Sequence, residues 1–244
     1  MTERAARRLS WPDCRNVRDI GGLPTTDGRQ IRVRALVRAD SPHRLTSAGV
    51  KAVCGYGVSR VLDLRSVSEA ANRPGPFAAD PMYRLVPLID PAREAERDTD
   101  AESTVARIYR ASVVRNAERI VAGLATIADA PPGAVLVHCA SGKDRTGMMV
   151  ALALRIAGAP DDVIADDYAL SAVCLHDEHE RALAAAADPA EHARLADLHS
   201  SDPDTILGML ARVDDAFGGV DGYVLANGMT GEQLDQLRAR LRTE

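Results

Sequence analysis

One stretch constrains this chain more than any other part of it. It runs Val135-Leu136-Val137-His138-Cys139-Ala140-Ser141-Gly142-Lys143-Asp144-Arg145-Thr146-Gly147. An apolar run typical of a buried strand ends at a cysteine, five residues lead to an arginine, and an apolar helical segment follows. The fold must therefore join a strand to a helix through a tight loop with Cys139 and Arg145 at its two ends.

Such a loop suits a tetrahedral anion. Successive backbone N–H groups in a tight strand-to-helix loop point inward, and the helix N-terminus adds partial positive charge at the same place. The planar guanidinium of Arg145 can return over the loop and bind two phosphate oxygens. A cysteine in these surroundings favours the thiolate form, which is the nucleophile. We therefore expect Cys139 to attack phosphorus.

Two other interpretations explain the stretch less well. A nucleotide-binding P-loop requires a glycine where Val137 stands and a Ser or Thr where Asp144 stands. A buried structural cysteine would account for Cys139 alone. It would leave the Gly-Lys-Asp-Arg-Thr-Gly run unexplained.

The pattern along the chain predicts an α/β fold. Strands alternate with helices in the first half, and everything after residue 137 has helical spacing. We expect a single domain over 1–244, with a mostly parallel central sheet flanked by helices and a helical C-terminal half. The expected strands cover 36–37, 61–64, 85–88 and 134–137; the expected helices cover 46–56, 66–72, one long amphipathic helix from Val113 to Ile127, 206–217 and 233–241.

Two charged segments interrupt this pattern. Residues 90–103 and 176–201 are dense in charged side chains, which is typical either of a solvated surface or of a mobile lid over a site. We place the catalytic core at 10–175 and treat 176–201 as a lid or insertion.

Composition excludes several classes of function. Thirty basic residues stand against 35 acidic ones, a formal charge of −5, and aromatic residues make up only 3% of the chain. Neither a broad basic surface nor stacked-base recognition is indicated, so we expect no nucleic-acid partner. The four cysteines are too widely spaced to indicate a disulfide framework or zinc ribbon; they are Cys14, Cys54, Cys139 and Cys174.

The hydropathy pattern indicates no membrane segment. The longest apolar run, 147–154, stops at Arg155 and is too short to span a bilayer. Residues 1–15 contain no apolar stretch that could serve as a signal-peptide core. We expect a cytoplasmic protein without stable membrane insertion, and export by a non-classical route stays open.

The stretch also resembles a known signature. His-Cys-x5-Arg-Thr is similar to the signature of cysteine-dependent phosphatases. The longer His-Cys-x-x-Gly-Lys-Asp-Arg-Thr-Gly resembles the atypical bacterial tyrosine phosphatase family, whose members act on proteins and phosphoinositides. Further similarity covers most of the chain: Asn16-Val17-Arg18-Asp19-Ile20-Gly21-Gly22, Arg38-Ala39-Asp40, Val61-Leu62-Asp63-Leu64-Arg65-Ser66 and Asp167-Tyr168-Ala169-Leu170-Ser171.

The resemblance implies a cysteine-phosphatase fold and assigns roles. Cys139 would be the nucleophile and Arg145 the phosphate clamp. Lys143 would add a second cation for a highly charged substrate, and Thr146 would orient the thiolate by hydrogen bonding. The expected substrate-binding residues are Ala140, Ser141, Gly142, Lys143, Thr146 and Arg65.

The proton donor for the leaving oxygen has two candidates. Asp63 ends an expected strand, and ligands gather at the carboxyl edge of a parallel sheet. Asp144 lies in the loop itself. Asp63 is slightly preferred, although an ion pair with Arg65 or a capping role would also explain it. The Trp11-Pro12-Asp13 tripeptide, found in the acid loop of eukaryotic tyrosine phosphatases, stands far from Cys139 and is interpreted as a coincidence.

Together these observations predict a phosphomonoester hydrolase that forms a phosphocysteine intermediate. The expected activity is that of a protein-tyrosine phosphatase, with phosphoserine, phosphothreonine or phosphoinositides as further substrates and a phosphate or sulfate anion binding in the loop. The alternatives are a catalytically idle phosphate-binding module and a thiol redox sensor. No cofactor and no metal are expected, because His176, His179 and Glu180 have no third His or Cys nearby.

Overall fold

The chain folds around a five-stranded, mostly parallel sheet. The computed structural model describes residues 7–243, so the ends of the expected 1–244 domain, and with them most of the segment before residue 10, lie outside the described residues. The strand order is β1-β2-β5-β3-β4, and only β1 is antiparallel to its neighbour. The strands are β1 (Arg18–Asp19), β2 (Leu36–Ala39), β3 (Val58–Asp63), β4 (Tyr83–Leu85) and β5 (Ala134–His138). The expected α/β class is confirmed.

Alternation along the strands divides the core into two layers. Because successive side chains of a strand point to opposite faces, Val135 and Val137 join the larger apolar cluster while Leu136 joins the smaller one. Each of β2, β3 and β5 is buried on both faces along most of its length. This explains why β5 is an apolar run rather than an alternating one.

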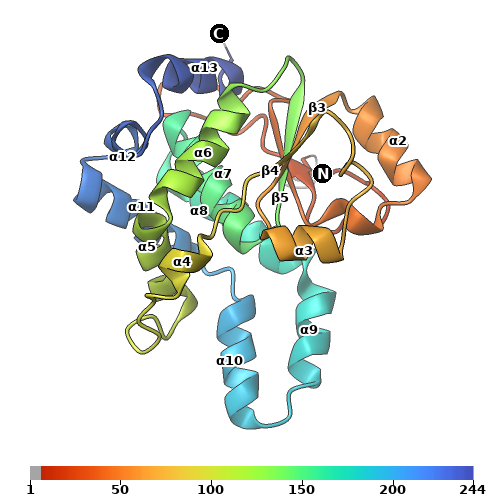
Figure 1. Ribbon diagram of the computed structural model, residues 1–244, viewed down its shortest axis with the longest axis vertical. Coiled ribbons are helices and arrows are strands. Elements are labelled where there is room, and N and C mark those ends of the chain that lie inside the picture. The colour runs from red at the N-terminus through yellow and green to blue at the C-terminus, as the bar shows by residue number, and fades with distance from the viewer. Residues whose placement is uncertain (1–6, 244) are drawn as a thin grey trace.

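The two faces of the sheet carry unequal layers of helices. The smaller cluster contains Trp11, Val17 and Phe77 and is covered by α2 (Ser47–Gly55). Within residues 7–243, seven helices carry the larger cluster on the opposite side of the sheet (Figure 1). They are α5 (Val105–Arg115), α6 (Ala117–Ala128), α7 (Asp144–Ile156), α8 (Asp161–Cys174), α11 (Pro203–Phe217), α12 (Val220–Ala226) and α13 (Gly231–Leu241).

Two of the predicted elements differ from the structure. The strand expected at 85–88 occupies Tyr83–Leu85, before Pro87, whose ring removes the N–H that a ladder needs. The single helix expected from Val113 to Ile127 is two helices, which meet at Asn116. The backbone of Asn116, at φ −107° and ψ 21°, departs from helical geometry, and its side chain accepts from the N–H of the distant Asp90 at 2.8 Å.

The charged segment 90–103 is anchored to the helical layer. It contains the short helix α4 (Pro91–Glu94), and Arg115 binds both Glu94 at 2.9 Å and Glu102 at 2.5 Å. These ion pairs attach the segment at the end of α5. Its residues do not line the cavity described below, so this segment is not placed as a lid over it.

The second charged segment forms a helical hairpin. It consists of α9 (His176–Ala184) and α10 (Pro189–His199), which lie side by side and project from the rest of the molecule (Figure 1). Neither helix contains a buried residue. Within residues 7–243, no helix has both the length and the apolar character required to cross a bilayer.

Candidate active site

The loop after β5 is held from outside by its carbonyl groups. The Ala140 carbonyl accepts from the Ser41 N–H at 2.9 Å, and the Ser141 carbonyl accepts from Asn16 Nδ2 at 3.1 Å. The Gly142 carbonyl accepts from Arg38 at 2.7 Å. These three bonds turn three consecutive peptide carbonyls outward, so the N–H groups face the other way.

The N–H groups of the loop are free to bind an anion. In the described part of the chain, no acceptor is recorded for the backbone N–H groups of Ser141, Gly142, Asp144, Arg145 and Thr146. Three of these belong to the first turn of α7, where helical geometry leaves N–H groups without internal partners. Unpaired amides and a helix N-terminus at one place form an anion-binding nest.

Gly142 is the residue that permits this backbone. Its φ of +72° lies in the left-handed region. A Cβ at this position would lie 2.4 Å from the Ala39 carbonyl oxygen and 2.6 Å from the Asp40 amide nitrogen. The loop can therefore pack against the end of β2 only with glycine here.

A buried charge network supports the loop from behind. Arg38 and Arg18, both at most 1% exposed, bind the Asp167 carboxylate at 2.8 and 3.0 Å. Arg18 also donates to Asn16 Oδ1 at 2.6 Å. Although burial alone would raise the pKa of Asp167, the guanidiniums of Arg18 and Arg38, with that of Arg7, hold it well below its usual value. Helix α8 thus positions both side chains that bind the loop carbonyls.

Cys139 lies between this network and Arg145. It is 2% exposed and packs against the larger apolar cluster. Burial and neighbouring Arg18 lower the pKa of Arg38, whereas Asp167 and Cys139 act in the opposite direction. Cys139 likewise contributes to the environment of Arg145. The sulfur therefore has two guanidiniums within electrostatic range.

The guanidinium of Arg145 is oriented by Glu69 of α3 (Val67–Asn72). Arg145 binds both carboxylate oxygens of Glu69, at 2.6 and 2.8 Å. Burial disfavours the charged Arg145, but the hydrogen bonds to Glu69 and the proximity of Cys139 raise its pKa overall. Hydrogen bonds from Arg145 also lower the pKa of Glu69 to about 2. A bidentate pair leaves the remaining N–H groups of Arg145 for a substrate oxygen.

Thr146 and Lys143 occupy different environments. The Thr146 hydroxyl is buried and has no hydrogen-bond partner within residues 7–243, which leaves it available to a sulfur or phosphate acceptor. Lys143 is 2% exposed, and its ammonium binds Asp144 at 2.6 Å and the Ser200 carbonyl at 3.0 Å. These contacts engage the ammonium of Lys143, and its expected role as a second cation for a highly charged substrate stays a prediction.

Asp63 is fully engaged in structural contacts. Arg65 donates to both of its oxygens at distances of 2.6 to 3.1 Å, and the Tyr83 hydroxyl donates at 2.8 Å. Burial alone would raise the pKa of Asp63, but Arg65, the nearby His138 and Tyr83 keep it below its usual value. The carboxylate is 0% exposed and stays ionised, so this geometry favours the ion pair with Arg65 over proton donation.

Asp144, in contrast to Asp63, is only partly engaged in contacts. Its Oδ1 accepts from Lys143 at 2.6 Å and from the Tyr109 hydroxyl at 2.8 Å. Its Oδ2 has no partner recorded in the described part of the chain, and the side chain is 38% exposed. One oxygen is therefore oriented by neighbours while the other can carry a proton.

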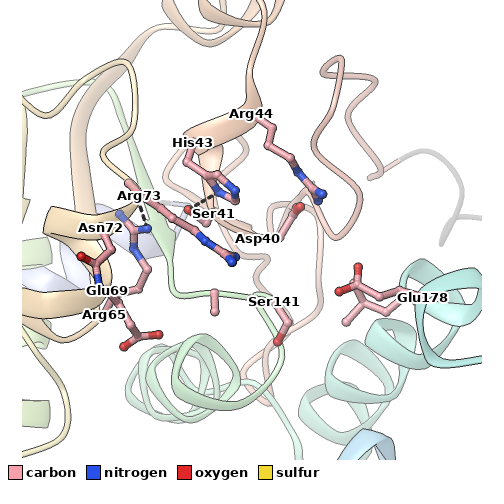
Figure 2. A pocket seen from close by; sticks show the side chains of 12 residues that line it. Asp40, Ser41, His43, Arg44, Arg65, Glu69, Asn72, Arg73, Ser141 and Glu178 are labelled. Carbon is pink, nitrogen blue, oxygen red and sulfur yellow. Dashed lines mark hydrogen bonds between the residues drawn. The ribbon is translucent and has the colours of Figure 1, made fainter. Parts of the chain in front are cut away.

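A cavity of about 320 Å³ opens beside the loop (Figure 2). Its wall includes Ala140 and Ser141 of the loop, residues that follow β2 and β3, and residues around the start of α9. The other lining residues are Asp40, Ser41, His43, Arg44, Arg65, Glu69, Asn72, Arg73, Leu175 and Glu178. No group of three or more His, Cys, Asp or Glu side chains suited to a metal occurs within residues 7–243.

Sequence reasoning missed the residues that position the others. Asn16, Arg38 and Asp167 were quoted only as points of resemblance, yet they support the loop. Glu69 forms a capping box with Ser66, three residues earlier, and this local pattern does not point to the site. Its contact with Arg145 spans 76 positions, and no local pattern predicts such a pair.

The chain is similar to several known proteins. A profile described as the tyrosine phosphatase family matches residues 9–243. A tyrosine-protein phosphatase of Nostoc commune is 30% identical over 89% of this chain and 78% of its own length. The triple specificity protein phosphatase PtpB of Mycobacterium tuberculosis is 27% identical over 97% of this chain and 99% of its own. Among solved structures, P. aeruginosa TpbA shows 19% identity and a TM-score of 0.39, covering 90% of this chain and 94% of its own.

Proposed function

The chain belongs to the tyrosine phosphatase family, and we propose that it hydrolyses phosphotyrosine in proteins through a phosphocysteine intermediate on Cys139. The observation that carries this mechanism is the loop of outward carbonyls and unpaired N–H groups between Cys139 and Arg145. Such a loop matches the three non-bridging oxygens of a phosphate monoester.

The first half-reaction transfers the phosphoryl group to sulfur. The loop amides and the guanidinium of Arg145 bind the non-bridging oxygens, and the Cys139 thiolate attacks phosphorus in line with the leaving oxygen. The S–P bond forms as the P–O bond to the tyrosine breaks. The phenolate oxygen takes a proton from a carboxylic acid, and tyrosine leaves.

The second half-reaction restores the enzyme. A water molecule attacks the phosphocysteine, and the carboxylate that has lost its proton accepts one from this water. The S–P bond breaks, inorganic phosphate leaves, and Cys139 returns to the thiolate. The Thr146 hydroxyl, which has no other partner in the described chain, would donate to the sulfur as it becomes the leaving group.

We assign the acid to Asp144 rather than Asp63. Asp144 has one unoccupied oxygen at the edge of the loop, whereas both oxygens of Asp63 are occupied and the residue is inaccessible. The free oxygen of Asp144 is the one that would pass a proton to the leaving oxygen. Lys143, bonded to the same carboxylate, would then orient the acid rather than bind substrate.

Replacing the nucleophile tests the reaction. Cys139→Ser should abolish turnover of p-nitrophenyl phosphate and leave the unfolding transition unchanged, whereas Cys54→Ser, at an exposed cysteine, should behave like the native protein. A phosphate-binding module or a redox sensor would show no burst of phenol release from the native protein. Activity that survives Cys139→Ser would overturn the mechanism.

A series of leaving groups tests the acid. Asp144→Asn should slow phenyl phosphate far more than p-nitrophenyl phosphate, since only the poor leaving group needs a proton. Asp63→Asn should lower the free energy of unfolding without changing the ratio of the rates for the two substrates. If Asp63→Asn, and not Asp144→Asn, slows phenyl phosphate more than p-nitrophenyl phosphate, Asp63 is the acid and the assignment is wrong.

A further inference from the structure

The cavity beside the loop is lined by two arginines that have no role in the mechanism. Its lining contains three carboxylates, and each has a partner. Glu69 binds Arg145 at 2.6 Å and Glu178 binds Arg15 at 2.6 Å, while Asp40 accepts from backbone N–H groups at 2.9 and 3.0 Å.

Two of the three arginines in the lining have no such partner. Arg65 is paired with Asp63. Among the described residues, no ion pair and no side-chain hydrogen bond is recorded for Arg44 or Arg73, and both are exposed. Two guanidiniums thus lie at the cavity without a recorded ion pair in the described chain, and Asp40 is the lining carboxylate that is bound by backbone N–H groups rather than by a cation.

The two arginines belong to neighbouring segments of the cavity wall. Arg44 ends the short 3-10 helix η1 (Pro42–Arg44), which follows β2, and Arg73 caps α3, which follows β3. A Cβ at Gly75, two residues after Arg73, would lie 3.6 Å from Pro42 Cγ and 3.9 Å from the His43 amide nitrogen, so the two segments contact each other. Figure 2 shows both side chains extending into the cavity, Arg44 towards Asp40 and Arg73 towards its centre.

The positive field reaches a neutral histidine in the same wall. His43 Nδ1 lies 3.0 Å from Ser41 Oγ. Burial, followed by the charges of Arg44, Arg65 and Arg73, lowers the pKa of His43. Three cations therefore act on one point of the wall, and a negatively charged group there would relieve their mutual repulsion.

We propose that Arg44 and Arg73 form a second anion subsite, which binds an acidic side chain next to the phosphotyrosine of a peptide substrate. This subsite rests on the proposed function, because it orients a peptide whose phosphate occupies the loop. A guanidinium fork matches a carboxylate. A singly charged carboxylate suits the site better than a second phosphate dianion, because Asp40 and Glu178 lie in the same wall.

The expected contribution is moderate because both arginines are exposed to solvent. Exposed ion pairs contribute little individually, so the two together should favour an acidic peptide by about three- to tenfold in kcat/KM. The preference should decrease with added salt, since screening weakens attraction between exposed charges. Turnover of p-nitrophenyl phosphate, which carries no second anion, should not depend on either arginine.

Paired peptides test the subsite. Phosphotyrosine peptides of equal length, with Glu or Gln directly before or after the phosphotyrosine, are compared on the native protein and on the Arg44→Gln/Arg73→Gln double variant. Arg107→Gln/Arg110→Gln is the matched control, since it removes the same charge from exposed positions outside this cavity. The Glu preference should disappear in the first variant only, with p-nitrophenyl phosphate turnover unchanged.

Other outcomes overturn the subsite separately from the proposed function. Equal kcat/KM for the Glu and Gln peptides, or a preference that survives the double variant, rules the subsite out. A doubly phosphorylated peptide that exceeds the Glu peptide would show a phosphoryl occupant instead of a carboxylate. Absence of p-nitrophenyl phosphate turnover would contradict the proposed function. The subsite is then decided by calorimetric binding of the same peptides to Cys139→Ser, which needs no turnover.

Discussion

Asp167→Asn should displace the phosphate-binding loop, although Asp167 is not part of that loop. Asp167 lies on α8 and is 1% exposed, and it binds Arg18, Arg38 and Arg7. The substitution keeps the shape of the side chain and removes its charge. Two fully buried guanidiniums then lose their counter-ion, including that of Arg38, which binds the Gly142 carbonyl at 2.7 Å.

The size of the expected loss of stability follows from the burial of these charges. Removing one partner of a buried ion pair costs about 3–5 kcal/mol, because the remaining charge stays buried without compensation. With a urea m-value of roughly 2.5 kcal/mol/M for a chain of this size, the midpoint should fall by about 1–2 M. Misplacement of the loop should lower kcat for p-nitrophenyl phosphate on the order of ten- to a hundredfold.

The effect should also depend on pH. The pKa of Asp167 is held far below its unfolded value, so its stabilisation is complete above about pH 4 and is lost as the pH falls further. The native protein should therefore lose stability in acid more steeply than Asp167→Asn. The difference between their unfolding free energies should narrow below pH 4.

Urea unfolding and steady-state kinetics on the same preparations provide the measurements. Asp162→Asn, an exposed position in the first turn of α8, is the control and should change stability by less than about 1 kcal/mol. If Asp167→Asn changes stability no more than this control does, the buried network does not support the loop.

Three further predictions concern the loop and its neighbours. Glu69→Gln keeps the helix cap and weakens the pair with Arg145. We expect kcat/KM for p-nitrophenyl phosphate to fall by about tenfold, with the free energy of unfolding nearly unchanged. Increased activity would mean that Glu69 blocks Arg145. Gly142→Ala forces a Cβ against the Ala39 carbonyl, and calorimetric phosphate binding should be lost; tight binding would refute the packing of the loop. Burial lowers the pKa of His138, so on acidification this histidine takes up a proton in the unfolded chain before it does so in the folded protein. The free energy of unfolding should therefore fall below about pH 6.5, by at most about 1.4 kcal/mol per pH unit from this residue. His138→Gln should flatten that slope in urea unfolding at pH 5–8, and an unchanged slope would contradict it.

Local patterns in the chain predicted much of the fold. The apolar run before Cys139, the helical spacing after Arg145 and the Asp202-Pro203 start of α11 all specify structure within a few residues. The division between α5 and α6 was not predicted. Their apolar face continues across Asn116, and only contacts of Asn116 with segment 90–94 separate them.

The sequence did not distinguish between the two candidates for the proton donor. Asp63 and Asp144 were equivalent as residue types near the carboxyl edge of the sheet. They differ in their partners, because Tyr83 comes from β4 and Tyr109 from α5. Burial and hydrogen bonding, rather than position in the chain, distinguish a saturated carboxylate from an accessible one.

The amino-acid sequence by itself determined the class of fold, the strand-loop-helix unit and the cysteine and arginine at its ends, because these depend on backbone preferences and periodicity over short segments. Only the tertiary structure decided what holds that unit in place. Arg38 and Asp167 stand 129 positions apart, and Glu69 and Arg145 stand 76 apart. Such pairs form because strand order and helix packing bring distant segments together, and no neighbouring residue carries that information.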